Sequence, residues 1–407
     1  MAKIFPFKAV RPSAQYTKKV ASPLFDVVSV EEARGLAKGN PYSFLWVDKA
    51  EINFPPHMGE HDPRIYEKAR ENLENMIKDG IMTQDTEPFL YIYKLSVGQK
   101  SQTGLGVLCA VSDYEQGVIV KHELIRPEKM TDRVNHINAC HAQASPVFLA
   151  YREADESKGV RPSSLMNDWI SDHSPEYDFD ADDGVRHTIW VLSDKNAINS
   201  LVEAFDTVPY LYIADGHHRS AAAAEAAKKG VAGSDRFLSV IFPHNELSIM
   251  DYNRLVKDLN GLDTGSFFTA LEERFDYQKL GKPFKPDKKG EYGLYIDKSW
   301  YRLSYRHTPP QDSVEGLSIS ILQNELLEKV LGISDPRTDK RIDFIGGSRS
   351  TGELEALVDA GQMAAAFTIC PVTMDELLTV SDTGRVMPPK STWFEPKLRG
   401  GLLVHKF

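Results

Sequence analysis

The stretch from Tyr210 to Ser220, followed by alanine-rich sequence to Lys229, constrains the fold of this chain more than any other segment. Residues 210–214 are a short apolar run of strand-forming residues, and Asp215-Gly216 interrupts it. The sequence from Ser220 to Lys229 is almost entirely Ala, Glu and Lys, which are strong helix formers. The pattern predicts a buried strand, a sharp polar turn and a helix, the kind of junction at which open α/β sheets bind ligands.

The residues of this turn suit a bound anion. Backbone N–H groups at the start of a helix lack intrahelical partners and favour negative charge. We expect Gly216 and Arg219 to bind phosphate, because the guanidinium is planar and always charged. His217 and His218 would neutralise charge that develops in phosphoryl transfer, and Asp215 would act as an acceptor or metal ligand. The alternative is a plain Asp-Gly turn in which Arg219 pairs with a neighbouring acid.

A second charged cluster, Lys121 to Arg133, is the other candidate. We expect Glu123 to close a strand end and face the ligand pocket, as a general base or as a magnesium ligand with Asp215. The residues that would hold substrate or phosphates are His122, Arg126, Lys129 and Arg133. A solvated charged surface is the alternative. If the cluster is functional, it should converge with the Asp215–Arg219 turn, although about 90 residues separate the two.

Several segments resemble the bacterial and archaeal family called domain of unknown function 1015. They are Asp215–Arg219 (DGHHR), Ala21–Ser29, Asn40–Leu45, Lys121–Arg133, Pro146–Leu149 and Met387–Thr392, which together span nearly the whole chain. The strand, Gly-Xaa-His-Arg turn and helix also resemble the ParB/sulfiredoxin-like fold. Members of that fold bind nucleotides through this turn and include CTP-binding partition proteins, sulfiredoxin and free-serine kinases. The resemblance implies a nucleotide ligand, whereas an activity has to be argued from the site.

Composition narrows the partners. The 407 residues carry a net charge of −10, which argues against nucleic acid and leaves a small-molecule ligand in a local basic pocket. No apolar run approaches the roughly 18 residues of a membrane span, so we expect no membrane partner. The first residues lack the apolar core of a signal peptide, which predicts a cytoplasmic protein. A homo-oligomer is compatible with the sequence. Three widely spaced cysteines predict neither a disulfide framework nor a zinc site.

We expect an α/β fold with a mixed sheet. A motif-bearing, ParB/sulfiredoxin-like domain would span residues 1–250, and a smaller α+β domain would span residues 251–407. The polar stretch 153–183 would be a mobile flap or an insertion. The sequence pattern further predicts helices over residues 29–38, 62–78, 129–142 and 253–260, and strands over residues 44–47, 147–151 and 210–214.

Three functions remain open at this point. The first is a small-molecule phosphotransferase, such as a kinase, or a nucleotide hydrolase, with a nucleotide and Mg²⁺ as cofactors. The second is a non-catalytic, nucleotide-sensing regulatory protein. Metal-dependent hydrolysis ranks third, because the adjacent His217 and His218 point in different directions. The H-x-x-E-H run at residues 57–61 does not change this order, because proline and glycine interrupt the helix that such a zinc motif needs.

Overall fold

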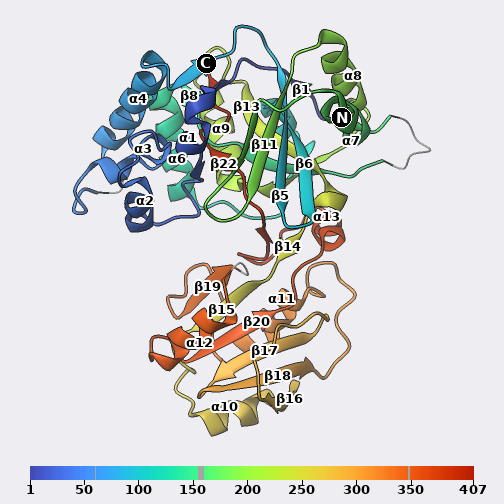
Figure 1. Cartoon of the computed structure of the whole chain (residues 1–407). Coiled ribbons are helices and arrows are strands. Elements are labelled where there is room, and N and C mark those ends of the chain that lie inside the picture. Colours follow the sequence, from blue (N-terminus) through green and yellow to red (C-terminus); the bar gives the residue numbers. More distant parts are fainter. Residues whose placement is uncertain (60, 155–159, 347–348) are drawn as a thin grey trace. The chain divides into compact units, whose positions relative to one another are not determined.

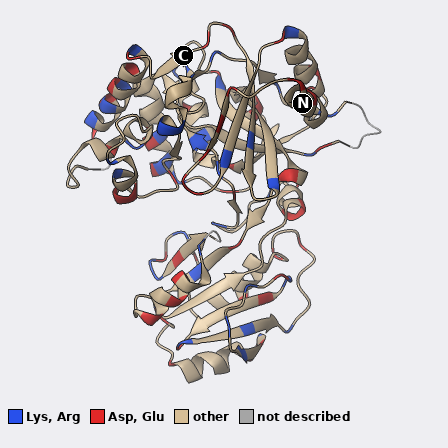
Figure 2. Ribbon diagram, in the orientation of Figure 1, with Lys and Arg blue, Asp and Glu red and all other residues tan. Residues whose placement is uncertain are grey.

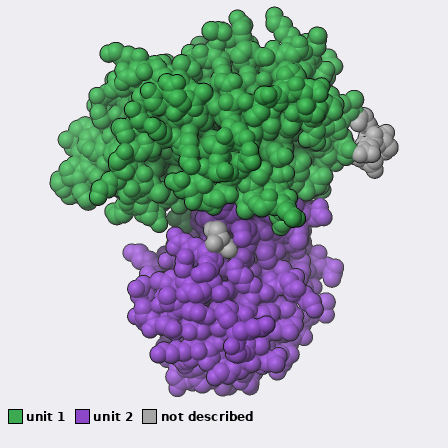
Figure 3. Space-filling view, in the orientation of Figure 1, with its two compact units in different colours: residues 1–121, 125–247, 396–407 green, residues 122–124, 248–395 purple. Residues whose placement is uncertain are grey.

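The computed structural model describes residues 1–59, 61–154, 160–346 and 349–407. The H-x-x-E-H run and the 153–183 stretch therefore lie partly outside the described residues. The chain forms two compact units, which Figure 3 shows in different colours. Unit 1 contains residues 1–121, 125–247 and 396–407, and unit 2 contains residues 122–124 and 248–395. The sequence-based division at residue 250 includes neither the excursion at 122–124 nor the return at 396–407.

Unit 1 is built on a mixed sheet with the order β10-β11-β5-β6-β13-β9-β12-β7, and β1 pairs with β6 (Figure 1). The pairs β9–β13 and β7–β12 are parallel, and the other pairs are antiparallel. The α/β fold class with a mixed sheet is thus confirmed. The strands are β1 (Ile4–Phe5), β5 (Leu90–Val97), β6 (Lys100–Ala110), β7 (Ile119–Val120), β9 (Val147–Tyr151), β10 (Tyr177–Asp180), β11 (Arg186–Leu192), β12 (Leu211–Asp215) and β13 (Arg236–Pro243).

Besides this sheet, unit 1 contains α-helices and three two-stranded ribbons. Helix α6 packs against both α4 and α9. The helices are α1 (Thr17–Val20), α2 (Val30–Ala37), α3 (Leu45–Asp48), α4 (Pro63–Lys78), α5 (Val111–Glu115), α6 (Pro127–Cys140), α7 (Pro162–Asp172), α8 (Lys195–Phe205) and α9 (His217–Ala227). The ribbons pair β2 (Val10–Pro12) with β4 (Met82–Gln84), β3 (Ser22–Pro23) with β22 (Arg399–Gly400), and β8 (Ala142–Gln143) with β23 (His405–Lys406).

Unit 2 has its own antiparallel sheet with the order β16-β18-β17-β20-β15-β19. Its strands are β15 (Tyr252–Val256), β16 (Phe275–Leu280), β17 (Glu291–Ile296), β18 (Ser299–Tyr305), β19 (Ile342–Gly346) and β20 (Ala365–Ile369), with the small pair β14 (Ile249–Met250) and β21 (Trp393–Phe394). Its helices are α10 (Thr264–Leu271), α11 (Ser318–Leu322), α12 (Thr351–Asp359) and α13 (Met374–Asp382), and a π-helix over Gln323–Glu328 continues α11.

Local signals locate several helices correctly. Ser29 caps α2 and forms a capping box with Glu32, because each side chain bonds the backbone N–H of the other residue. Asp62 caps α4, and Pro63 occupies its first turn, where a missing N–H costs nothing. The predicted helices over residues 29–38 and 62–78 are confirmed.

Two other predictions are wrong. Residues 44–47 lie at the start of α3 instead of in a strand, because a four-residue apolar run carries no usable period. Residues 253–260 were expected to be helical, but Tyr252–Val256 form β15, which pairs on both sides within its sheet. Sheet pairing there overrides a charged, helix-like pattern. In its described part, the stretch 153–183 contains α7 and β10, and its assignment as a flap or an insertion stays a prediction.

Candidate functional site

The predicted strand, turn and helix form as expected, except that the helix begins earlier. Strand β12 ends at Asp215, and α9 begins at His217 instead of Ser220. Gly216 is the N-cap with a φ of 105°, a conformation that residues with side chains rarely adopt. A Cβ at this position would also lie 3.1 Å from Cζ of Arg219. Glycine is therefore required both by the backbone turn and by the guanidinium that packs against it.

Arg219 is buried in a network of opposite charges. Its side chain is 5% exposed, and Nη2 lies 3.3 Å from Oδ2 of Asp26 and 3.3 Å from Oδ1 of Asp215. Nη1 donates to the carbonyl oxygen of Pro146. Lys397 completes the network, because its Nζ lies 3.0 Å from Oδ2 of Asp215. Pairing with neighbouring acids is the alternative to an anion site at Arg219, so direct phosphate binding by this residue stays a prediction.

The network determines the protonation of Asp215. Burial alone would raise the pKa of this carboxyl, but the charges of Lys397 and Arg219 outweigh burial and hold the pKa below its usual value. A carboxylate with a lowered pKa is a weak base, because effective general bases titrate near the working pH. The electrostatics favour Asp215 as a charge partner or metal ligand over a general base.

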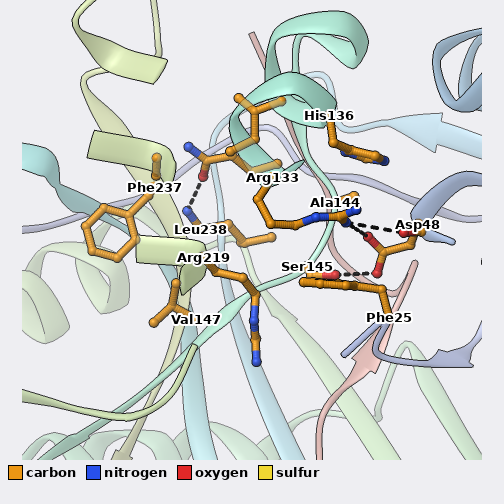
Figure 4. Close-up of a pocket in the computed structure, with 13 residues that line it drawn as sticks. Phe25, Asp48, Arg133, His136, Ala144, Ser145, Val147, Arg219, Phe237 and Leu238 are labelled. Carbon is orange, nitrogen blue, oxygen red and sulfur yellow. Dashed lines mark hydrogen bonds and ion pairs between the residues drawn. The ribbon is translucent and has the colours of Figure 1, made fainter. Parts of the chain in front are cut away.

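Arg133, from the second predicted cluster, lies beside this network (Figure 4). Its Nη1 donates to the backbone carbonyl and to Oδ1 of Asp48, at 3.2 and 3.3 Å, and Nε donates to Asp132 at 2.8 Å. The guanidinium also stacks over Phe25, with Cζ 3.8 Å from the ring centroid. Ser145 donates to the other oxygen of Asp48 at 2.5 Å. These contacts satisfy Arg133 within the protein.

A small cavity separates the guanidinium groups of Arg133 and Arg219. Its volume is about 30 Å³, and Phe25, Asp48 and Ser145 also line it. A water molecule needs roughly 10–15 Å³ of such space, so the cavity has room for a water molecule or two. A nucleotide does not fit there. Any nucleotide site in unit 1 must therefore lie outside this cavity.

The start of α6 does lie beside the start of α9. The backbone N–H of Arg126 donates to Nε2 of His218 at 2.9 Å, although 92 residues separate them. Neither N-cap supplies a side-chain cap to its helix, so two helix N-termini with positive partial charge lie together. In this bond Nε2 of His218 is the acceptor. The side chains of Arg126 and Lys129 are exposed.

His122 and Glu123 belong to unit 2, so their predicted convergence with the Asp215–Arg219 turn stays a prediction. His122 is 1% exposed, its carbonyl accepts from the N–H of Met387 at 2.8 Å, and its Nε2 lies 3.4 Å from Oγ1 of Thr392. Glu123 lines a pocket of unit 2. Within the described ranges, no group of three or more His, Cys, Asp or Glu side chains is arranged to hold a metal ion.

Sequence reasoning missed Lys397 and Asp48. Lys397 follows Asp215 by 182 residues in the segment that returns to unit 1, and a lone lysine in a mixed tail carries no local signal. Asp48 was missed because residues 44–47 were predicted to form a strand, whereas Asp48 ends helix α3. A signal did exist for Asp26, because it belongs to one of the family-like segments.

Two further features concern charge and apolar helices. In the view of Figure 2, Lys and Arg residues are interspersed with Asp and Glu residues along the helices and strands. Among the helices that the structure describes, none combines the length and the apolar composition needed to cross a membrane.

Comparison with solved structures finds resemblances at low identity. A conserved hypothetical protein from Pyrococcus furiosus is 16% identical with a TM-score of 0.37, over 76% of this chain and 98% of that chain. A free serine kinase in complex with AMP is 13% identical with a TM-score of 0.38, over 77% and 93%. SbnI with a C-terminal truncation, from Staphylococcus aureus, is 13% identical with a TM-score of 0.39, over 74% and 87%.

Comparison of sequences is more decisive. No curated protein matches the chain. The family model described as Protein of unknown function (DUF1015) matches residues 4–326, which is most of the chain and includes both the DGHHR turn and the Lys121–Arg133 cluster. This protein therefore belongs to the DUF1015 family.

Proposed function

We propose that this protein binds a nucleotide by its phosphates where α6 and α9 begin, and uses it as a small-molecule phosphotransferase or nucleotide hydrolase. The observation that carries the proposal is the bond from the Arg126 N–H to His218, which joins two helix N-termini without side-chain caps. Paired helix N-termini present backbone N–H groups and positive partial charge to the same anion.

The side chains near these helix starts would have separate roles in binding the nucleotide. The exposed Arg126 and Lys129 would contact the outer phosphates, because they can move toward a ligand without leaving a buried carboxylate unpaired. Arg219 would not contact the phosphates, since its charge is already paired with Asp26 and Asp215. It would instead hold the turn in place and add positive potential to it. Asp215 would hold Mg²⁺ through the carboxylate that now contacts Lys397.

His218 would change state on binding. Its neutral ring accepts from Arg126, so it can bear positive charge toward a phosphate only if Nε2 gains a proton and this bond breaks. Protonation on phosphate binding would release the start of α6.

One observation favours a non-catalytic nucleotide sensor as the second candidate. Asp215 is held ionised by two cations and has a lowered pKa, so it is not poised as a general base. A sensor needs only the phosphate contacts. Catalysis requires a base from elsewhere, and Glu123 keeps that proposed role.

The test is nucleotide binding by calorimetry and thermal shift, with and without Mg²⁺, followed by turnover with a panel of small hydroxyl-bearing metabolites. Lys129→Ala should weaken binding, because each charge-assisted contact contributes about 1.5–3 kcal/mol. The matched control is Lys229→Ala, which removes an exposed lysine just beyond the opposite end of α9 and should leave binding unchanged.

The outcomes separate the two candidates. Binding with turnover, reduced about a hundredfold in Glu123→Gln, supports the enzyme. Binding without turnover across the panel supports the sensor. If no nucleotide binds, or if Lys129→Ala and Lys229→Ala behave alike, the paired helix starts are not a phosphate site and both candidates fail.

A further inference from the structure

Unit 2 contains a buried cation without an opposite charge. Arg254, in β15, is 2% exposed, and its guanidinium donates to the backbone carbonyls of Tyr252 and Pro389, the second at 3.1 Å. Among the residues that the structure describes, no carboxylate lies within 4.0 Å of its nitrogen atoms. Arg133 and Arg219 of unit 1 are comparably buried, but each contacts carboxylates. Burial lowers the pKa of Arg254 to about 9, because the surrounding protein compensates its charge poorly.

The register of the sheet shows why the neighbouring strands supply no carboxylate to Arg254. Residues opposite one another in paired strands share a face of the sheet, and side chains alternate between the faces along each strand. Arg254 lies opposite Phe344 in β19 and Phe367 in β20, with Cζ 4.8 Å from the centroid of the Phe344 ring. Asn253 lies on the other face, and its Nδ2 donates to Oδ2 of Asp251 at 2.7 Å. Packing alone would favour an apolar side chain in place of Arg254, because an unpaired buried charge is costly.

Arg254 anchors the loop that carries Lys390. Its bond to the carbonyl of Pro389 fixes the residue directly before Lys390. Directly after it, Oγ of Ser391 donates to the carbonyl of Pro388 at 2.6 Å. Lys390 itself has a φ of 57°, a left-handed conformation that is uncommon outside glycine and persists only where the surrounding structure imposes it. The loop is therefore held in one conformation by contacts on both sides of this lysine.

Lys390 adds an exposed charge beside the buried one. The residue is exposed, and its Nζ is 5.6 Å from the centroid of the Tyr252 ring. Cζ of Arg254 is 5.9 Å from the same centroid. Two cations thus approach one aromatic ring, and water screens a buried charge far less than an exposed one. The positive potential of Arg254 therefore adds to that of Lys390, which favours an anion here.

We propose that Lys390 binds an oxyanion of a small-molecule ligand, a phosphate or a carboxylate group, and that Arg254 is a positioning residue for this lysine. An ammonium group donates up to three hydrogen bonds and accepts none, and an oxyanion supplies both the acceptors and the opposite charge. Arg254 is too buried to contact the ligand, so it acts by holding the loop through Pro389 and by raising the local potential. The inference comes from residues of unit 2 and does not rest on nucleotide binding where α6 and α9 begin.

The experiment measures how fast an acylating reagent modifies Lys390 in the full chain, by peptide mass spectrometry, with inorganic phosphate or acetate added at constant ionic strength. Lys298 is the control within the same sample, because it is also an exposed lysine of unit 2 with a left-handed φ, of 56°. A bound oxyanion covers the amine and favours its unreactive protonated form, so modification of Lys390 should slow roughly fivefold or more while that of Lys298 stays unchanged. The ion that protects identifies the group as phosphate or carboxylate. Protection by neither ion, or equal protection of both lysines, would overturn the proposal.

Variants of Arg254 separate positioning from stability. Arg254→Met removes a buried charge, so the melting temperature should change little, while the oxyanion concentration that half-protects Lys390 rises roughly tenfold. Arg254→Lys keeps the charge and should restore most of the protection. If Arg254→Met does not fold, Arg254→Lys still tests the proposal, because lost protection in a folded variant that keeps the charge contradicts it. A lower melting temperature with an unchanged half-protecting concentration would show a merely structural role and refute the role assigned to Arg254.

Discussion

Replacing Lys397 with methionine should destabilise unit 1 in a way that depends on pH. The lysine Nζ lies 3.0 Å from Oδ2 of Asp215, and the side chains are 16% and 26% exposed. At this distance, an effective dielectric constant of about 20 gives a gross attraction of roughly 5 kcal/mol, much of which offsets desolvation. Arg219 remains to compensate the carboxylate in the variant. We therefore expect a net loss of about 2 kcal/mol at neutral pH.

The pH dependence follows from the lowered pKa of Asp215. A carboxyl whose pKa is lowered on folding contributes stability above its unfolded pKa and loses it as the pH falls through the folded pKa. Lys397→Met removes one of the two cations that lower this pKa, so the pKa of the variant should be higher. Urea unfolding should show a stability gap between wild type and variant that is nearly constant near neutral pH and narrows only in strong acid, below about pH 3, where the variant and then the wild type bind the proton.

Two further variants isolate the ion pair from packing. Lys397→Arg keeps a cation and should retain most of the stability at neutral pH. Lys229→Met, at an exposed lysine, should change the stability little at any pH. A stability gap for Lys397→Met that stays constant into strong acid, down to about pH 2, would show that the lysine does not act through its charge on Asp215. That result would refute the electrostatic reasoning.

Three other predictions concern single residues. Gly216→Ala should cost about 1–3 kcal/mol in urea unfolding, because a φ of 105° strains alanine and the new Cβ presses on the neighbouring guanidinium; an unchanged midpoint would contradict this. Ser29→Ala should cost about 1 kcal/mol through loss of the capping box, and a loss below a few tenths would show that tertiary contacts hold α2. Burial raises the pKa of Cys109 and of Cys140 to about 12, so a thiol reagent should label only Cys370 before unfolding, as peptide mapping will show.

Local chemistry allowed part of the fold to be predicted from the sequence. The helices α2 and α4 have side-chain caps and starting residues that act within a few positions of the chain. The β12–α9 junction was predicted for the same reason, since strand formers, a glycine and an alanine run are adjacent. The error in β15 has the opposite origin, because that strand is held by partners that lie far away in the sequence.

The candidate site, like the fold, could be predicted where adjacent residues determine it and could not be predicted where distant residues do. Eleven consecutive residues are enough to predict that a turn with Asp215, two histidines and Arg219 begins a helix, whereas membership of the family rests on the match over residues 4–326. What Arg219 and Asp215 do there depends on Asp26 and Lys397, which contact them across 193 and 182 residues of chain. No local pattern encodes such pairs. Burial alone makes them obligatory, because a guanidinium or carboxylate removed from water must find an opposite charge or a donor wherever the fold supplies it.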